Sequence, residues 1–194
     1  MPASRRKIVI SLDTYLSILA VVSSFCAIGI TFYQAYLQRT QQYASVMPVL
    51  DGYTSNGSSD DGYRYDLIFV NNGVGPAFIK GYEYFYKKKR YDDFHSIVRQ
   101  IGLNQAGAQN RMAFDTLPIK NIDFSNFWVN RIMPQNQEIK LVSIIDDSLA
   151  RWVYEAYKRR EINVKIRYAS IYNEEWQFEL RPEKIELQNQ KVSN

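Results

Sequence analysis

The chain of 194 residues is poor in the side chains that build disulfides and metal sites, with a single cysteine, Cys26, and a single histidine, His95. A disulfide needs two cysteines, and a structural zinc site needs four Cys or His ligands. His95 lies in no motif such as H-E-x-x-H. Glu174 and Glu175 are adjacent residues of a predicted hairpin, so they would point to opposite faces. We therefore expect no catalytic residue, no metal and no cofactor.

Beyond the N-terminus, the chain also lacks a marked excess of either positive or negative charge. The chain has 24 basic and 20 acidic residues, which gives a net charge of +4. Three of the basic residues are Arg5, Arg6 and Lys7, so the rest of the chain is nearly balanced. A nucleic-acid-binding surface needs a strong positive field, and this composition does not indicate one.

Long hydrophobic runs are absent except for YLSILAVVSSFCAIGITFY at residues 15–33. About 20 apolar residues in a helix cross the hydrocarbon core of a bilayer, so we expect a transmembrane helix over 15–36. A basic tail, 1–14, precedes it. A helical extension, 37–48, follows, because no Gly or Pro occurs there before Pro48. The run is too long for a signal peptide and no small-residue cleavage site follows it.

Flanking charge predicts how the helix is oriented. Arg5, Arg6 and Lys7 stand before the apolar run and Arg39 alone follows it closely. Basic residues accumulate on the cytoplasmic side of membrane helices, so this asymmetry favours a cytoplasmic N-terminus. We expect a single-pass protein of the inner membrane, and leave the side of the soluble domain open.

One face of the predicted helix carries only small or polar residues. This face, called the stripe below, follows steps of four and three: Asp13, Ser17, Ala20, Ser24, Ala27, Thr31, Gln34 and Gln38. Small residues with hydroxyls and amides mark helix–helix packing faces in lipid, and a 3.5-residue repeat predicts a left-handed bundle. We expect a homo-oligomer in the lipid bilayer. Four or more helices would enclose a cation-attracting, water-filled path, whereas a dimer or trimer would have no lumen.

Beyond Val49 the pattern changes to short alternating runs separated by turn signals. Residues 51–62 are polar and Gly-rich and predict a loop. We expect an antiparallel β-sandwich over 49–188, with one or two packed helices, and a C-terminal tail over 189–194. The expected elements are strands at 63–70 and 77–86 joined by a turn at 71–76, a helix at 91–102, two short strands within 127–144, a helix from Asp146 to about Arg159, and a hairpin over 161–181.

Two basic clusters are candidate contacts for an anionic ligand or for lipid headgroups. They are Lys87, Lys88, Lys89 and Arg90, which follow a Tyr-rich strand, and Lys158, Arg159 and Arg160. Aromatic side chains beside cations stack bases and hold phosphates. The alternative is a solvated turn and a helix C-terminus whose dipole favours positive charge. The first interpretation predicts a nucleotide or protein ligand for the soluble domain, and the sequence does not identify it.

Three segments give the chain a resemblance to known proteins: YASVMP at 43–48, NNGVGPA at 71–77 and SIYNEEW at 170–176. Behind a single N-terminal membrane helix, they resemble those of a loose group of bacterial membrane-anchored β-sandwich proteins without assigned activity. The layout is also similar to single-helix membrane effectors of anti-phage defence systems, in which a soluble sensor controls membrane damage. This resemblance implies a pore or channel controlled by a β-rich sensor domain. The alternative is a membrane-anchored binding module with a passive anchor.

Overall fold

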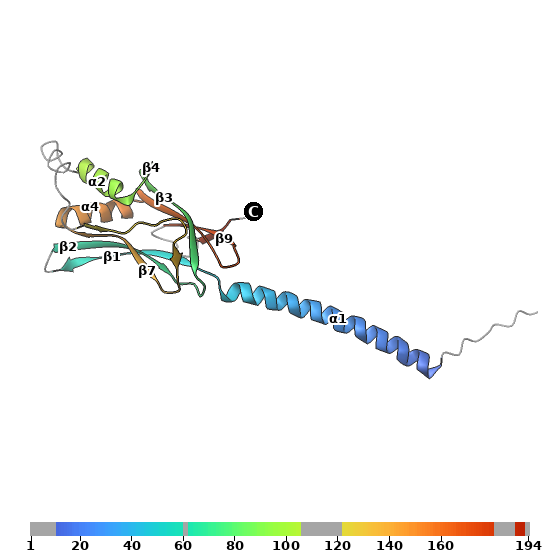
Figure 1. The fold of residues 1–194 in the computed structure, drawn as a ribbon. Coiled ribbons are helices and arrows are strands. Elements are labelled where there is room, and N and C mark those ends of the chain that lie inside the picture. Colours follow the sequence, from blue (N-terminus) through green and yellow to red (C-terminus); the bar gives the residue numbers. More distant parts are fainter. Residues whose placement is uncertain (1–10, 60–61, 106–121, 181–188, 193–194) are drawn as a thin grey trace, which may run out of the picture. The chain divides into compact units, whose positions relative to one another are not determined.

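The computed structural model describes residues 11–59, 62–105, 122–180 and 189–192 (Figure 1). It divides into two compact units, an N-terminal unit that ends at Ala44 and a second unit that begins at Ser45. Within these described ranges, the first unit contains one helix and the second is a β-sheet domain with two further helices, as the sequence predicts.

The helix of the first unit, α1, is continuous over Leu12–Ser45, 34 residues. At 1.5 Å per residue it is about 50 Å long. Among the described residues it is the one helix that is long and apolar enough to cross a membrane, and none of its residues is buried. The structure places the end of α1 at Ser45, within the helical extension or linker predicted over 37–48. Pro48 disfavours the helical conformation at the residue before it, which limits how far a helix can continue.

In the described part of the chain, ten strands build two antiparallel sheets, seen as two layers in Figure 1. The first sheet has the order β1-β2-β7-β5, with β1 at Leu50–Ser59, β2 at Gly62–Asn71, β7 at Glu138–Ile145 and β5 at Ile122–Phe124. The second has the order β10-β9-β8-β3-β4, with β6 also paired to β3. Its strands are β3 at Ala77–Tyr86, β4 at Lys89–Tyr91, β6 at Ile132–Met133, β8 at Ile162–Ala169, β9 at Glu175–Glu179 and β10 at Asn189–Lys191.

Aromatic side chains fill the space between the two sheets. Phe69 of β2 meets Phe178 of β9 edge-on, with ring centroids 5.7 Å apart, and Phe127 in the same manner at 5.2 Å. Gly52 of β1 lies against this cluster, since a Cβ atom there would come within 3.0 Å of Phe178 and Leu180. The predicted sandwich is therefore confirmed, with its core formed by inward-facing residues of both sheets.

Two helices pack together at one end of the sandwich (Figure 1). The helix α2 spans Phe94–Gln105, and Asp93 accepts a hydrogen bond from the backbone of Ser96 at 2.6 Å. The helix α4 spans Asp147–Lys158, and its N-cap Asp146 accepts hydrogen bonds from Ser148 and Leu149. An acidic N-cap residue accepts hydrogen bonds from N–H groups that have no partner within the first helical turn. The helix predicted to begin at Asp146 therefore begins directly after this cap.

Two sequence expectations are corrected. Residues 51–62, predicted as a loop, lie largely in β1, which pairs along its whole length with β2. The polar composition is tolerated because β1 is an edge strand with exposed positions. The predicted turn joins β2 to β3, and because these strands belong to different sheets, the segment 72–76 crosses from one sheet to the other. Residues 189–191, predicted as tail, form β10.

The side chain of Asn189 attaches β10 to the sandwich. Its Nδ2 donates a hydrogen bond to the Leu50 carbonyl at 2.7 Å, and its Oδ1 accepts one from the Tyr168 hydroxyl at 2.7 Å. Leu50 belongs to one sheet and Tyr168 to the other, so this residue connects both.

Candidate functional site

All eight residues of the stripe lie on α1, and all are exposed in the single chain. Because α1 runs without a break to Ser45, the same steps of three and four continue to Gln41 and Ser45. Sequence reasoning stopped at Gln38, where the apolar run had already ended. No large apolar side chain interrupts the stripe or its continuation from Asp13 to Ser45. A complete seven-residue repeat over this length is the pattern of helices that wind around one another.

The hydroxyl groups of the stripe are bonded within the helix. Ser17, Ser24 and Thr31 each donate a hydrogen bond to the carbonyl four residues earlier, at 2.8, 2.9 and 2.8 Å. These carbonyls belong to Asp13, Ala20 and Ala27, the preceding members of the stripe. The hydroxyl protons therefore need no partner in lipid, while each oxygen keeps the capacity to accept a hydrogen bond or face a cation.

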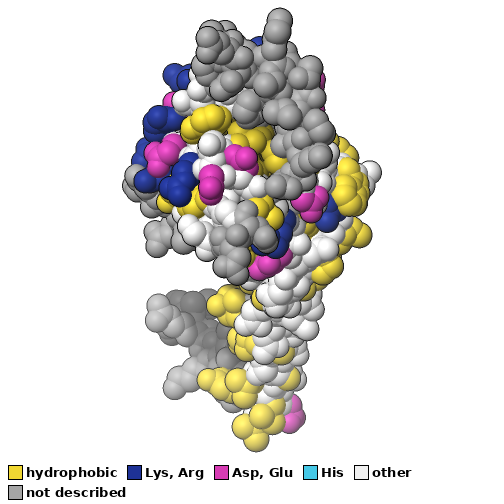
Figure 2. Space-filling model, turned by 90° about the vertical axis from the view of Figure 1, so that its left-hand side faces the viewer, with side chains coloured by type: hydrophobic (Ala, Val, Ile, Leu, Met, Phe, Trp, Pro, Cys, Tyr) yellow, Lys and Arg dark blue, Asp and Glu magenta, His cyan; other side chains and the backbone are white. Residues whose placement is uncertain are grey.

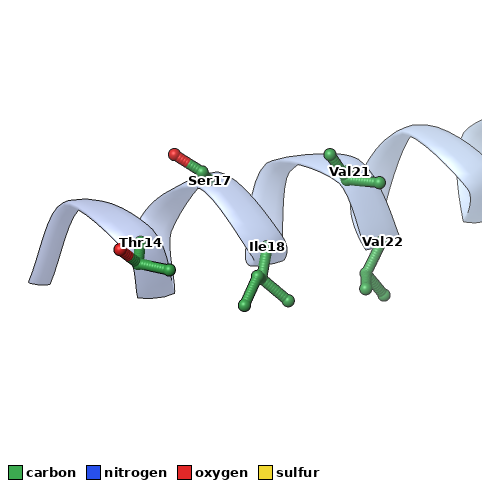
Figure 3. Close-up of a pocket in the computed structure, with 5 residues that line it drawn as sticks. All are labelled: Thr14, Ser17, Ile18, Val21 and Val22. Atoms are coloured by element: carbon green, nitrogen blue, oxygen red, sulfur yellow. The ribbon is translucent and has the colours of Figure 1, made fainter. Parts of the chain in front are cut away.

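Two shallow grooves on the surface of α1 include residues of the stripe among their lining. One groove is lined by Thr14, Ser17, Ile18, Val21 and Val22, and Figure 3 shows Ser17 pointing to the side opposite Ile18 and Val22. A second is lined by Ala27, Ile28, Thr31, Phe32 and Ala35. Such grooves accept the side-chain ridges of another helix, and small residues let the two backbones approach.

Tyrosines lie near both ends of the apolar run of α1. Tyr15 and Tyr33 are exposed and about 27 Å apart along the helix axis, and Tyr36 follows one turn later. This separation is close to the thickness of the hydrocarbon core, and tyrosine prefers the interface between lipid and water.

Asn71 fixes the segment that connects α1 to the β domain. The residue is fully buried, and its Nδ2 donates hydrogen bonds to the carbonyls of Gly75 and Met133 at 2.8 and 2.9 Å. Its Oδ1 accepts from the backbone N–H groups of Val49 and Gly73 at 3.2 and 3.0 Å. Both amide protons and the carbonyl oxygen of this side chain are thus engaged.

The connecting segment 46–49 lies directly against the turn that follows β2. Its backbone accepts hydrogen bonds from Asn72 at Val49 and from Val74 at Met47, at 2.8 and 3.1 Å. A Cβ atom at Gly73 would overlap the backbone of Met47 and Val49, and one at Gly75 would overlap the backbone of Val46. We call Asn71, Gly73 and Gly75 the clamp. From the sequence these residues are predicted only to form a turn. No local pattern indicates that residues 46–49 pack against that turn.

The two predicted basic clusters meet at one corner of the β domain. Lys87, in the turn between β3 and β4, and Arg159, at the end of α4, both form ion pairs with Glu161, at 3.8 and 3.5 Å. We call this region the basic corner; it comprises Lys87, Lys88, Lys89, Arg90, Lys158, Arg159 and Arg160. Figure 2 shows one side of the molecule, on which Lys and Arg side chains are interleaved with Asp and Glu.

Acidic side chains next to the basic corner partly neutralise its positive charge. Arg90 pairs with Glu83 at 3.2 Å and Lys158 with Glu155 at 3.8 Å, and these side chains are substantially exposed. Exposed ion pairs contribute about 0–1 kcal/mol each, so they leave the cations available to a competing anion. Lys87, Lys88 and Arg160 also adopt positive φ values, whereas the other described non-glycine residues with positive φ are asparagines.

The remaining residues considered from the sequence lie apart from these regions. His95 is exposed on α2, where its ring meets Phe124 edge-on at 5.0 Å. Glu174 accepts a hydrogen bond from Lys191 at 2.6 Å in the turn before β9. Within the part of the chain that the structure describes, no group of three or more His, Cys, Asp or Glu side chains is placed to hold a metal ion.

Comparison with protein-family models, with curated proteins and with solved structures gives no match for this chain.

Proposed function

We propose that this chain is a single-pass membrane protein that assembles with copies of itself through the stripe on α1, and that the assembled helices enclose an ion-conducting path. The observation that carries the proposal is the unbroken run of small and polar residues from Asp13 to Ser45 on one continuous helix. Lipid offers no hydrophobic drive for helix association, so close packing and hydrogen bonds between helices must provide it.

The chemistry of the stripe suits an aqueous path better than a dry interface along its whole length. Asp13 places a carboxylate at one end, and Gln34 and Gln38 place amides at the other. Between them the hydroxyl oxygens of Ser17, Ser24 and Thr31 keep acceptor capacity beyond their internal hydrogen bonds. Oxygen ligands of this kind favour cations over anions when four or more helices surround the path.

The β-sandwich domain acts as the control element in this proposal. The clamp holds residues 46–49, the segment that follows α1 directly, in the framework of the domain. A ligand that shifts the turn after β2 would therefore act on the chain next to the helix. A role in antiviral defence rests on the resemblance of the layout alone and stays a prediction, as do the inner-membrane location and the cytoplasmic N-terminus.

The basic corner favours a second candidate, a membrane-anchored module that binds an anionic ligand and uses α1 only as an anchor. Conductance of the purified chain in planar bilayers separates the two functions. Cation-selective channels that disappear in Ser24→Leu support the pore. A bilayer that stays sealed, with and without polyphosphate as an anionic probe, supports the passive anchor.

A further inference from the structure

Large apolar side chains are exposed on the β domain mainly at one end. Six of them, called the apolar rim below, have exposed fractions between 42% and 61%: Val74, Trp128, Val129, Ile132, Ile171 and Tyr172. Scattered exposed apolar residues are normal on a protein surface, whereas a contiguous group marks an interaction site.

The apolar rim is contiguous because its segments converge on the start of β3. Phe78 of β3 pairs with Ile132 on one side and with Ala169, which precedes the turn that carries Ile171 and Tyr172, on the other. The loop of Trp128 and Val129 joins at the same place, since Asn130 donates a hydrogen bond to the Ile79 carbonyl at 2.8 Å.

The apolar rim reaches the connecting segment at Val74. Val74 lies within the turn of the clamp and donates its backbone hydrogen bond to Met47. The basic corner lies at the other end of β3, where Tyr86 pairs with Lys89. The domain is therefore apolar around the entry of the chain and charged at the opposite end.

The exposed indole of the apolar rim is held in place. The Arg131 guanidinium lies over the Trp128 ring, 4.1 Å from its centroid, and donates a hydrogen bond to the Asn126 carbonyl at 3.2 Å. Arg131 also donates its backbone N–H to the Trp128 carbonyl. A side chain that is already ordered loses little conformational entropy on binding, as expected of an interface anchor.

We propose that the apolar rim packs against the apolar rim of a second copy of this chain. This inference rests on the proposed assembly through the stripe. The continuation of the stripe reaches Ser45, and packed helices lie 8–10 Å apart, so neighbouring connecting segments start close together. A domain of about 150 residues has a radius of gyration of roughly 15 Å, which is wider than that spacing. The surfaces around the entry points of neighbouring copies are then close enough to meet.

The length of α1 favours a protein partner over the lipid surface. Ser45 lies nine positions beyond Tyr36, about 13 Å along the helix, and the residues between them include Gln38, Arg39, Thr40, Gln41 and Gln42. The headgroup layer on one side of a bilayer is only roughly 5–7 Å thick. The polar turns of α1 are thus long enough to extend past the headgroups before the chain enters the β domain.

Cysteine cross-linking of the full chain in lipid vesicles tests this proposal, in a Cys26→Ser background that removes the native thiol. Val129→Cys and Ile171→Cys report on the apolar rim, and Gln41→Cys reports on the continuation of the stripe. Lys88→Cys, exposed at the basic corner, is the matched control. With a short bis-maleimide and a high lipid-to-protein ratio, we expect at least tenfold more dimer from the two rim variants than from Lys88→Cys.

The combination of reporters separates the two proposals. Cross-links at Gln41→Cys with none above the control level at the rim overturn the rim contact and leave the assembly standing. Absence of cross-links at every position overturns both. A fluorophore on Val129→Cys that is quenched by brominated lipids, without rim cross-links, identifies a lipid-facing surface and also overturns the contact between copies.

Discussion

The Asn71 side chain holds the backbone of Val49, 22 residues earlier in the chain, through a hydrogen bond of 3.2 Å. This contact ties the turn after β2 to the segment that follows the membrane helix. The same side chain reaches Met133 of β6, so one buried amide joins the connecting segment to both sheets. Changes in this amide therefore test whether the domain is firmly attached to the segment that leads to α1.

Replacing Asn71 by Ala should lower the free energy of unfolding by about 2–4 kcal/mol, because four buried backbone groups lose their partner. Asn71→Asp should be at least as harmful, since a carboxylate oxygen would face the carbonyls of Gly75 and Met133. Urea unfolding of the detergent-solubilised chain, followed by tryptophan fluorescence, measures the change. The control is Asn72→Ala, an exposed neighbour, for which we expect less than about 0.5 kcal/mol.

Gly75→Ala should release the connecting segment without unfolding the domain core. The added Cβ overlaps the backbone of Val46, so one of the two segments must move. Limited proteolysis should then cut within residues 46–49 at least tenfold faster than in the native chain. Gly57→Ala is the matched control, because a Cβ atom there meets nothing within 4 Å. Equal cleavage rates in the two variants would contradict the clamp.

Bulky residues on the stripe should disrupt assembly, whereas bulky residues on the opposite face should not. Ser24→Leu and Thr31→Leu replace small side chains that let helices approach, and we expect conductance to fall at least tenfold. Gly29→Leu adds the same side chain on the other side of α1, where the structure leaves open space. Single-channel recording compares the variants, and an equal loss in Gly29→Leu would show that the stripe has no special role.

The β domain should lose stability as the pH rises above about 10. Burial raises the pKa of Tyr65, Tyr84 and Tyr168 above the usual value of 10.0. In the unfolded chain these hydroxyls ionise near pH 10, whereas in the folded domain they stay protonated. The unfolded state then binds fewer protons, so the free energy of unfolding falls with rising pH by about 4 kcal/mol per unit for three tyrosines.

Tyr65→Phe isolates one of these groups. Its hydroxyl is buried and has no hydrogen-bond partner among the described residues, so its removal should change stability at pH 7 by less than about 1 kcal/mol. The slope above pH 10 should fall by roughly a third. Urea unfolding at a series of pH values measures both quantities, and an unchanged slope would contradict the assignment.

Periodicity made the long elements predictable. The alternation that ends at Phe69 and the cap at Asp146 each describe a local preference that the structure keeps. Strand β1 was missed because its Ser, Asn and Gly residues read as a loop, and only the ladder with β2 makes them a strand. The basic corner and the clamp depend on contacts between distant segments, such as Lys87 with Glu161, and no local pattern encodes those.

The stripe was predictable to Gln38 because helical spacing is a property of the sequence alone. Its continuation to Ser45 required the observed length of α1. The apolar rim was not predictable, since Val74, Trp128 and Tyr172 are far apart in the chain and their exposure depends on the folded sheets. Tertiary packing decides which apolar residues remain outside the core.

The mass of the assembled protein tests the central claim most directly. Native mass spectrometry of the full chain, released from lipid nanodiscs, measures how many 22.7 kDa copies stay together. The account predicts a complex of at least four copies, which dissociates when Ser24 and Thr31 are both replaced by Leu and persists in Gly29→Leu. A mass of 22.7 kDa for the native chain would contradict it, because a single helix can enclose no path.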